Sequence, residues 1–148
     1  MSDHSIEVSW LRNGGAFDRG NYAREHQVRF AGGQSVSNSA AGDYGGSAAA
    51  SNPEELLLAA LSSCHMLTFL AVAANRGYVI DSYSDRATAT LDKNADGKMA
   101  VTHAVLVPQV QFGGDKKPSQ EDYAALHQRA HAACFIANSV KTTVDVRV

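Results

Sequence analysis

Two cysteines and a group of histidines are the residues of this 148-residue chain whose types and spacing could support redox or metal chemistry. Cys64 and Cys134 are its only cysteines and lie 70 residues apart. A deprotonated thiol is a nucleophile and a metal ligand, whereas a protonated thiol in a buried helix is a small apolar side chain. Two crossing helices could bring the sulfurs within disulfide range, which requires Cα atoms roughly 4.4–6.8 Å apart. The spacing alone does not decide between a reactive cysteine pair and two inert buried thiols.

The histidines offer a metal site as an alternative. His127, His131 and Cys134 follow one another at steps of four and three residues, so they would share one face of a helix. Together with His65 or Cys64 they could form a zinc or copper site of two to four ligands. The chain lacks the Cys-x-x-Cys and His-Glu-x-x-His patterns of tight metal sites. We therefore expect no metal, with His127 in solvent and His131 packed, and keep the metal-binding protein as a rival.

Two further classes use the same cysteines. A hydrolase would need a histidine base beside its cysteine, but Cys64 and His65 are neighbours on a predicted helix, where consecutive side chains point about 100° apart. His65 therefore cannot serve as the base for Cys64. A redox-sensing or ligand-binding module would use the thiols without turnover, and steady-state consumption of peroxide distinguishes it from an enzyme.

Composition limits the remaining classes. With 45% hydrophobic residues, 19% charged residues and a net charge of −2, the chain is typical of one globular domain, which we place at 1–148. The 13 Lys and Arg are scattered and form no basic stripe for nucleic acid. The first ten residues include Asp3 and Glu7 and no apolar run, so we expect no signal peptide. Two cysteines are too few for a secreted disulfide framework, and we predict a cytoplasmic protein.

The segment 56–75 contains no charged residue and is long enough to span a membrane. Ser62, Ser63 and His65 lie near its middle, where polar groups are costly in lipid, and no second apolar span follows. We therefore predict a helix buried against a sheet or a partner subunit, and no membrane association. Cys64 would lie on an apolar stripe of this helix, together with Leu57, Leu61, Thr68 and Ala71.

The whole pattern predicts an α+β fold with a mostly antiparallel sheet. The first helix begins after Asn52, whose side chain can cap it, and ends before Gly77. The second begins after Ser119, with Asp122 placed as in a capping box, and continues to about Asn138. Strands are predicted at 6–11, 23–31, 78–91, 99–112 and 142–148, with a hairpin loop at 92–97 and a long loop at 32–51.

The segment 52–66, NPEELLLAALSSCHM, resembles the most recognisable segment of the OsmC/Ohr family of osmotically inducible and organic hydroperoxide resistance proteins. In that family an Asn-Pro-Glu start opens a long buried helix, and the peroxidatic cysteine follows ten residues after the glutamate. Glu54 and Cys64 keep this spacing. The segment 130–140, AHAACFIANSV, is similar to the second helix of the family and places Cys134 at the position of the resolving cysteine.

The resemblance implies an OsmC-like fold with two long central helices, an intertwined homodimer, and no cofactor. It also implies a two-cysteine peroxidase: Cys64 would reduce an organic hydroperoxide, Cys134 would then form a disulfide with it, and a dithiol reductant, such as a lipoyl-type dithiol, would reduce that disulfide. His65 and Phe135 depart from the family pattern, which often has Phe or Tyr and Pro there, and this bears on substrate more than on fold. Apolar residues predicted near the thiol favour alkyl or lipid hydroperoxides: Leu61, Met66, Leu67, Phe69 and Phe135.

A buried thiolate needs a positive partner, because the unperturbed cysteine pKa is about 8.5 and burial raises it. The resemblance implies an arginine from the N-terminal strands, held by Glu54. We prefer Arg24 and keep Arg19 as the alternative. Ten helical residues at about 1.5 Å each place Glu54 roughly 15 Å from Cys64, too far to orient an arginine easily on the thiol of its own chain. This distance favours a homodimer with shared active sites.

Overall fold

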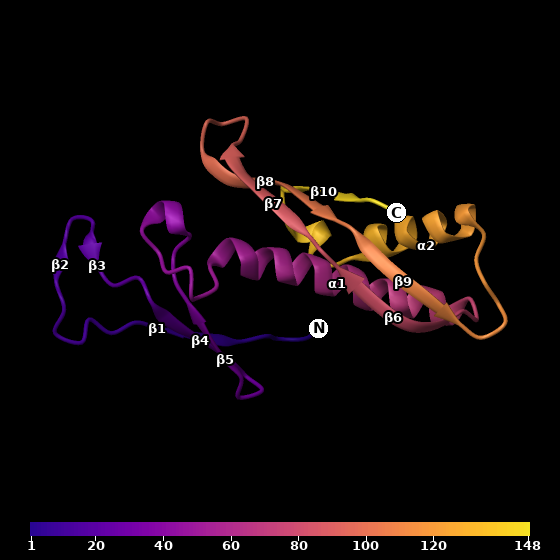
Figure 1. Ribbon diagram of the computed structural model, residues 1–148, viewed down its shortest axis with the longest axis horizontal. Helices are drawn as coiled ribbons and strands as arrows, with labels where there is room; N and C mark the ends of the chain where they lie inside the picture. Colours follow the sequence, from indigo (N-terminus) through magenta and orange to yellow (C-terminus); the bar gives the residue numbers. More distant parts are fainter. The chain divides into compact units, whose positions relative to one another are not determined.

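The computed structural model describes all residues from 1 to 148 and contains two compact units, residues 1–56 and 57–148. Two long helices accompany four small sheets whose strand pairs are antiparallel, with one parallel exception. This composition confirms the predicted α+β class (Figure 1). The assignment of a single domain to 1–148 stays a prediction.

The first unit is built on a three-stranded antiparallel sheet. Its central strand, β4 (His26–Phe30), pairs with β1 (Ile6–Ser9) on one side and with β5 (Ser35–Asn38) on the other. The predicted strands at 6–11 and 23–31 are therefore present but shorter. The remaining elements are a small hairpin of β2 (Phe17–Asp18) and β3 (Asn21–Tyr22) and the 3₁₀ helix η1 (Gly42–Tyr44).

Helix α1 (Pro53–Asn75) begins and ends where its capping residues predict. The Glu55 N–H donates to the Asn52 side chain at 2.9 Å, and the Glu55 carboxylate accepts from the Asn52 N–H at 3.2 Å. This reciprocal pair is a capping box that satisfies two free N–H groups. After the helix, Gly77 adopts a φ of 75°, a left-handed conformation that costs glycine little.

By length and composition alone, α1 is one helix that could cross a membrane. Its central polar side chains have partners in the protein: the Ser62 hydroxyl donates to Asp85 at 2.5 Å, and His65 is hydrogen-bonded to His127 at 2.9 Å. These bonds join the helix to other elements of the second unit, as in a core helix. In its most apolar 18-residue stretch 22% of the residues are fully buried, most of the others are half-buried, and Leu67 is 60% exposed, so part of its apolar surface is left uncovered.

The two long strands predicted at 78–91 and 99–112 are each divided in two. The antiparallel pairing breaks near Val107, whose N–H donates to the Asp85 carboxylate at 2.7 Å instead of to a strand partner. The last strand of the chain, at 143–146, pairs in parallel with the strand at 99–106. The strands are β6 (Val79–Asp85), paired with β9 (Pro108–Gly113), and β7 (Thr88–Lys93), paired with β8 (Met99–Leu106), which also pairs with β10 (Thr143–Val146).

Helix α2 (Gln120–Ala133) starts after Ser119, whose hydroxyl accepts from the Asp122 N–H at 3.1 Å, as predicted. It ends five residues before the predicted end, because the chain becomes extended at Cys134 before the 3₁₀ helix η2 (Ala137–Ser139).

The core of the second unit lies where α1 and α2 meet the β6–β9 ribbon, and these four elements lie together in Figure 1. Phe69 of α1 is fully buried, with the rings of Tyr83, Phe112 and Tyr123 5.7 to 6.5 Å away. Tilted and edge-on aromatic contacts of this kind add to the stabilisation from apolar burial. The buried residues of this cluster are Phe69, Ala73, Leu126 and Ala130.

Candidate functional site

The structure brings the two cysteines together. Cys64 is half-buried on α1, and Cys134 is only 1% exposed at the end of α2. Both are free thiols, and the Cys134 side chain is in hydrogen-bonding contact with that of Cys64. Helix α1 positions one sulfur and the end of α2 positions the other. The predicted pair is therefore adjacent, and the roles of its members as nucleophile and resolving cysteine stay predictions.

The surroundings of Cys64 favour its thiolate. Burial raises the pKa of this thiol, but hydrogen-bond donors around the sulfur together outweigh burial, and the pKa lies below its ordinary value. The contributors that lower the pKa are, in order of effect, the Ile136 N–H, the Cys134 thiol and the Phe135 N–H, followed by Thr68, whose hydroxyl donates to the Cys64 carbonyl at 2.8 Å. Hydrogen bonds to the charged form of a group stabilise that form.

Cys134 is affected in the opposite direction. Burial and then the contact with Cys64 raise the pKa of Cys134, although the Ala137 N–H donates to its sulfur at 3.4 Å. When the pair holds one proton, Cys134 therefore carries it and Cys64 is the thiolate. The arrangement places the more acidic thiol beside the less acidic one.

A second buried polar pair begins one residue further along α1. Nε2 of His65 lies 2.9 Å from Nδ1 of His127, and the rings are almost parallel, at 6°. The pKa of each histidine is lowered to about 4, chiefly by burial; nearby His131 contributes to the lowering at His65, and His65 contributes to it at His127. Both imidazoles are neutral at pH 7.

The predicted exposure of His127 is wrong, because this side chain is buried, whereas His131, predicted to be packed, is half-buried. His127 faces α1, where its ring stacks on Phe69 with 4.2 Å between centroids. The core stripe of α1 is correspondingly shifted by one residue from the predicted stripe through Cys64. Its members are Leu61, His65, Phe69 and Ala73.

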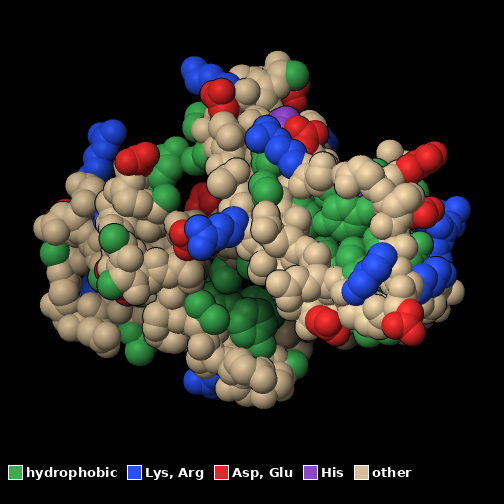
Figure 2. Space-filling model, turned by 45° about the vertical axis from the view of Figure 1, so that its right-hand side comes forward, with side chains coloured by type: hydrophobic (Ala, Val, Ile, Leu, Met, Phe, Trp, Pro, Cys, Tyr) green, Lys and Arg blue, Asp and Glu red, His purple; other side chains and the backbone are tan.

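This shift also changes the expected surroundings of the thiol. Leu61 and Phe69 are core residues and cannot contact a substrate. Leu67, 60% exposed, and Phe135, 80% exposed, are the apolar side chains that remain at the surface near the cysteines in sequence. Other hydrophobic side chains also reach the surface in patches between charged ones (Figure 2).

The metal alternative lacks a ligand set. The structure contains no group of three or more His, Cys, Asp or Glu side chains arranged to hold one ion. The side chains of His65 and His127 instead bond to each other.

In the first unit, Arg24 is half-buried just before β4 and is held by several contacts. Its guanidinium donates to the Tyr22 carbonyl at 3.0 Å and lies 4.4 Å from the centre of the Tyr22 ring. It also packs on Gly45, where φ is 73° and a Cβ atom would come within 3.1 Å of the guanidinium carbon. Arg19 is exposed between β2 and β3. Arg24 is thus held by more contacts than Arg19, and the choice of Arg24 as the partner of Cys64 stays a prediction.

Sequence reasoning missed the residues that hold the backbone of Arg24. Nδ1 of His26 lies 2.8 Å from the Arg24 carbonyl, and Nε2 lies 3.1 Å from the Asn38 side-chain nitrogen. Since that amide nitrogen can only donate, the proton of His26 is on Nδ1 and points to Arg24. These residues are 12 positions apart in sequence on paired strands, and no local pattern links them.

Arg24 also borders an apolar cavity of about 500 Å³ within the first unit. Glu54, in the first turn of α1, has one buried carboxylate oxygen without a hydrogen-bond partner. A buried, unpaired carboxylate oxygen is costly, which makes Glu54 a candidate for contact with a cation. The cavity walls are largely aromatic and aliphatic: Val8, Trp10, Phe17, Tyr22 and Pro53.

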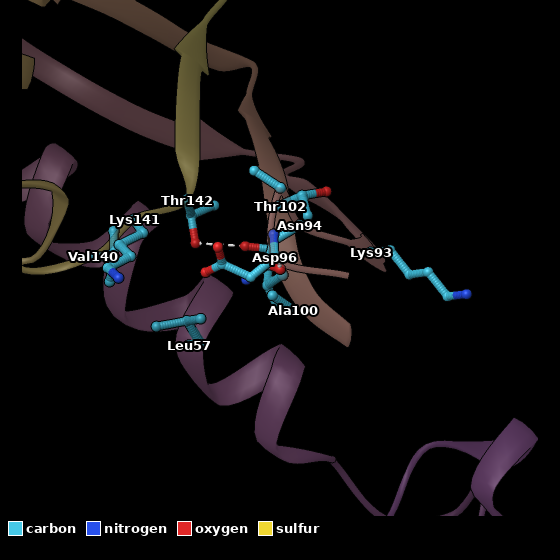
Figure 3. A pocket seen from close by; sticks show the side chains of 11 residues that line it. Leu57, Lys93, Asn94, Asp96, Ala100, Thr102, Val140, Lys141 and Thr142 are labelled. Atoms are coloured by element: carbon cyan, nitrogen blue, oxygen red, sulfur yellow. Dashed lines mark hydrogen bonds between the residues drawn. The ribbon is translucent and has the colours of Figure 1, made fainter. Parts of the chain in front are cut away.

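A cavity of about 680 Å³ lies in the second unit, and neither cysteine lines it. Figure 3 shows Leu57 of α1 facing the β7–β8 loop and the segment before β10. Thr142 donates to the Val101 carbonyl at 2.7 Å, and Lys93 points away from the other labelled residues (Figure 3). The residues that line this cavity therefore include neither member of the thiol pair.

Solved structures share this fold. An OsmC-like protein of unknown function from Vibrio cholerae is 44% identical, with a TM-score of 0.95 and 99% of both chains covered. The organic hydroperoxide resistance protein OsmC of Legionella pneumophila is 19% identical, with a TM-score of 0.72, covering 99% of this chain and 95% of its own. OhrB of Bacillus subtilis, an organic hydroperoxide resistance protein, is 19% identical, with a TM-score of 0.67, covering 99% and 96%.

A search of the curated proteins returned no match. The family model described as OsmC-like protein matches residues 45–148, which include both helices and both cysteines. The chain therefore belongs to the OsmC-like protein family.

Proposed function

We propose that this protein is a thiol-dependent peroxidase that reduces organic hydroperoxides. The observation that carries the proposal is the adjacent thiol pair, in which the pKa of Cys64 is lowered and that of Cys134 is raised. The thiolate is the reactive form of cysteine, and a neighbouring thiol can resolve its oxidised product. The hydroperoxide resistance proteins that share the fold support the choice of substrate class.

The bonds made and broken in this chemistry involve only the two cysteines, the hydroperoxide and a dithiol reductant. The Cys64 thiolate attacks the distal oxygen of the hydroperoxide, the S–O bond forms as the O–O bond breaks, and the alkoxide takes up a proton and leaves as an alcohol. The Cys134 thiol then displaces water from the Cys64 sulfenic acid and forms a disulfide. A dithiol, of lipoyl type in this proposal, reduces the disulfide by exchange and is itself oxidised to a disulfide.

We further propose a cytoplasmic homodimer in which a second copy supplies Arg24 and Glu54 to each Cys64. Three observations support it: the uncovered apolar surface of α1, the unpaired buried oxygen of Glu54, and the separation of Glu54 from Cys64 by ten residues of one helix. In this dimer, the arginine adds a positive charge to the backbone donors around the thiolate. Glu54 acts as its positioning residue.

Steady-state consumption of cumene hydroperoxide with a dithiol tests the proposed activity. We expect turnover by the wild type, none by Cys64→Ser, and a single turnover by Cys134→Ser that leaves a sulfenic acid trappable with dimedone. Hydrogen peroxide should be the poorer substrate. A redox sensor would instead lose its thiols stoichiometrically and consume no further peroxide, an outcome that would refute the enzyme.

Mixing two inactive variants tests the shared site. A mixed dimer of Cys64→Ser and Arg24→Ala subunits contains one complete site if the arginine acts across the two-fold axis. Random exchange should then restore roughly a quarter of the wild-type activity, because about half the dimers are mixed. If each chain builds its own site, mixing restores nothing, and the shared-site proposal fails.

A further inference from the structure

Arg24 lies two residues before β4, so its backbone groups lie outside the strand pairing and are bound by side chains instead. The Arg24 N–H donates to the Glu25 carboxylate at 3.1 Å, and the Arg24 carbonyl lies 2.8 Å from Nδ1 of His26. The Trp10 indole N–H donates to the carbonyl of the preceding residue, Ala23, at 2.8 Å. Three side chains thus fix the peptide groups on both sides of Arg24.

The contact with His26 is one end of a longer chain of hydrogen bonds. Asn38, opposite His26 in the pairing of β4 with β5, is 2% exposed and donates from its side-chain nitrogen to Nε2 of His26 at 3.1 Å. The Asn38 oxygen accepts from the Ser51 hydroxyl at 3.0 Å, and this hydroxyl also lies 3.1 Å from the Ser37 carbonyl. Ser51 forms an isolated β-bridge with Asn38 and directly precedes the capping residue of α1. The side chains of Ser51, Asn38 and His26 therefore connect the start of α1 with the Arg24 backbone.

The order of donors and acceptors in this chain determines the tautomer of His26. The Ser51 hydroxyl donates to the Asn38 oxygen, which turns the amide nitrogen towards His26. A neutral imidazole that accepts at Nε2 carries its proton on Nδ1, where it can donate to the Arg24 carbonyl. If the Asn38 amide were reversed, its oxygen would bind a proton on Nε2, and the bare Nδ1 would face the Arg24 carbonyl, one acceptor against another. Ser51 and Asn38 therefore set the tautomer with which His26 binds Arg24.

We propose that His26 is a positioning residue for Arg24, and that Asn38 and Ser51 hold His26 in the tautomer that this role requires. The guanidinium of Arg24 is bound separately by the carbonyl and ring of Tyr22, so a fixed backbone leaves the arginine side chain few other conformations. A cation that is already held in place loses little further freedom when it meets an anion. The role in catalysis rests on the proposed function, in which Arg24 supports the thiolate. The hydrogen-bond chain itself does not.

Two substitutions of His26 separate the roles of its two ring nitrogens. Asn is the shorter amide, and its nitrogen can take the place of Nδ1, so His26→Asn keeps a donor for the Arg24 carbonyl. Gln is longer by one methylene, and its amide takes the place of Nε2, so His26→Gln keeps the contact with Asn38 and loses the donor to Arg24. Both side chains are neutral amides with the same donors and acceptors. The matched pair therefore differs in which end of the hydrogen-bond chain it preserves.

The test is kcat/KM for cumene hydroperoxide with a dithiol reductant. His26→Gln should lower it roughly tenfold, because a displaced charge loses part of its effect, and His26→Asn should retain most of the wild-type value. In an Arg24→Ala background, His26→Gln should cause no further loss, because a positioning residue acts only through the group that it positions. A merely structural role would lower the activity by the same factor in both backgrounds. Ser51→Ala frees the Asn38 amide and should give a smaller loss than His26→Gln, with the same dependence on Arg24.

Circular dichroism checks that each variant is folded. If His26→Gln does not fold, Ser51→Ala carries the test, and an unchanged kcat/KM there overturns the inference. So would an unchanged value in folded His26→Gln, an equal loss in His26→Asn, or a full further loss in the Arg24→Ala background. Nitrogen-15 NMR tests the chain without peroxide: we expect neutral His26 to carry its proton on Nδ1, and a proton on Nε2 would also overturn the inference. A wild type that shows the Nδ1–H tautomer but consumes no hydroperoxide would refute the proposed function and leave the hydrogen-bond chain intact.

Discussion

Cys64 and His65 are consecutive residues of α1 that face two different polar centres. The thiol centre contains Cys64, Cys134 and the turn after α2, and the imidazole centre contains His65 and His127. Burial pushes the groups of both centres towards their neutral forms. At the thiol centre backbone N–H groups donate to the sulfur and reverse this effect for Cys64, whereas the imidazole centre stays neutral. The supply of donors, and not depth alone, decides which group is charged.

The difference has a functional meaning. A buried charge is costly unless it is hydrogen-bonded, so a site that keeps an anion must provide donors. The thiol centre does so and is suited to a reactive thiolate. At the imidazole centre, Nδ1 of His65 and Nε2 of His127 are buried without partners, and the stacked contact with Phe69 makes the pair part of the core. We therefore expect the imidazole centre to make the stability of the fold sensitive to acid, and the thiol centre to supply the reactive group.

The largest expected effect concerns the imidazole centre and acid. The folded-state pKa values of His65 and His127 are about 4, below the unfolded value of about 6.5. Their unfolded forms therefore bind protons first as pH falls, and stability present above pH 6.5 is lost between about pH 6.5 and 4. At about 1.4 kcal/mol per unit, each group accounts for roughly 3 kcal/mol.

Urea denaturation between pH 7.5 and 4 measures this loss. His127→Gln removes one of the two titrating groups and should flatten the dependence of stability on pH. His4→Gln, at an exposed histidine of the first unit, is the control and should retain the wild-type slope. An identical slope in His127→Gln and the wild type would contradict the account of the imidazole centre.

The next effect concerns the charge that supports the thiol centre. Arg24→Ala should raise the pKa of Cys64 by roughly two units, equivalent to about 2.7 kcal/mol, and lower the peroxidase rate at neutral pH by tens to hundreds of fold. Glu54→Gln should do less, because it only positions the arginine. Alkylation rates against pH provide the measurement. Arg19→Ala is the internal comparison: an equal loss there would mean that the wrong arginine was chosen, and an unchanged pKa in both would eliminate this activation.

The smallest effect tests whether packing near the two centres can be separated from their chemistry. Ser62→Ala removes the hydroxyl that donates to Asp85 at 2.5 Å and should lower the free energy of unfolding by about 1–2 kcal/mol. It should not change the pKa of Cys64. Ser63→Ala, at the exposed neighbouring position, should change neither quantity. A shifted Cys64 pKa in Ser62→Ala would show that the thiol centre depends on the anchoring of α1 to β6.

Local chemistry in the sequence was enough to predict the starts of both helices, because the capping side chains of Asn52 and Ser119 act within four residues. The adjacency of Cys64 and Cys134 followed from family resemblance and not from spacing. The burial of His127 could not be predicted, since its partner, His65, is 62 residues away and both histidines look polar in sequence.

Two other features depend on tertiary structure. The division of the long strands depends on Asp85, whose carboxylate replaces a strand partner for Val107. The donors at Phe135 and Ile136 left no trace in the sequence, because every residue except proline has a backbone N–H. Only the turn after α2 directs these groups at sulfur.

The most direct test of the thiol centre is its response to one equivalent of an organic hydroperoxide without reductant. Cys64 should be oxidised and then resolved by Cys134, so that both free thiols disappear. Mass spectrometry of the non-reduced digest should identify a Cys64–Cys134 disulfide within one chain. Recovery of two free thiols, or a Cys64 sulfenic acid that persists beside an unreacted Cys134, would contradict the account.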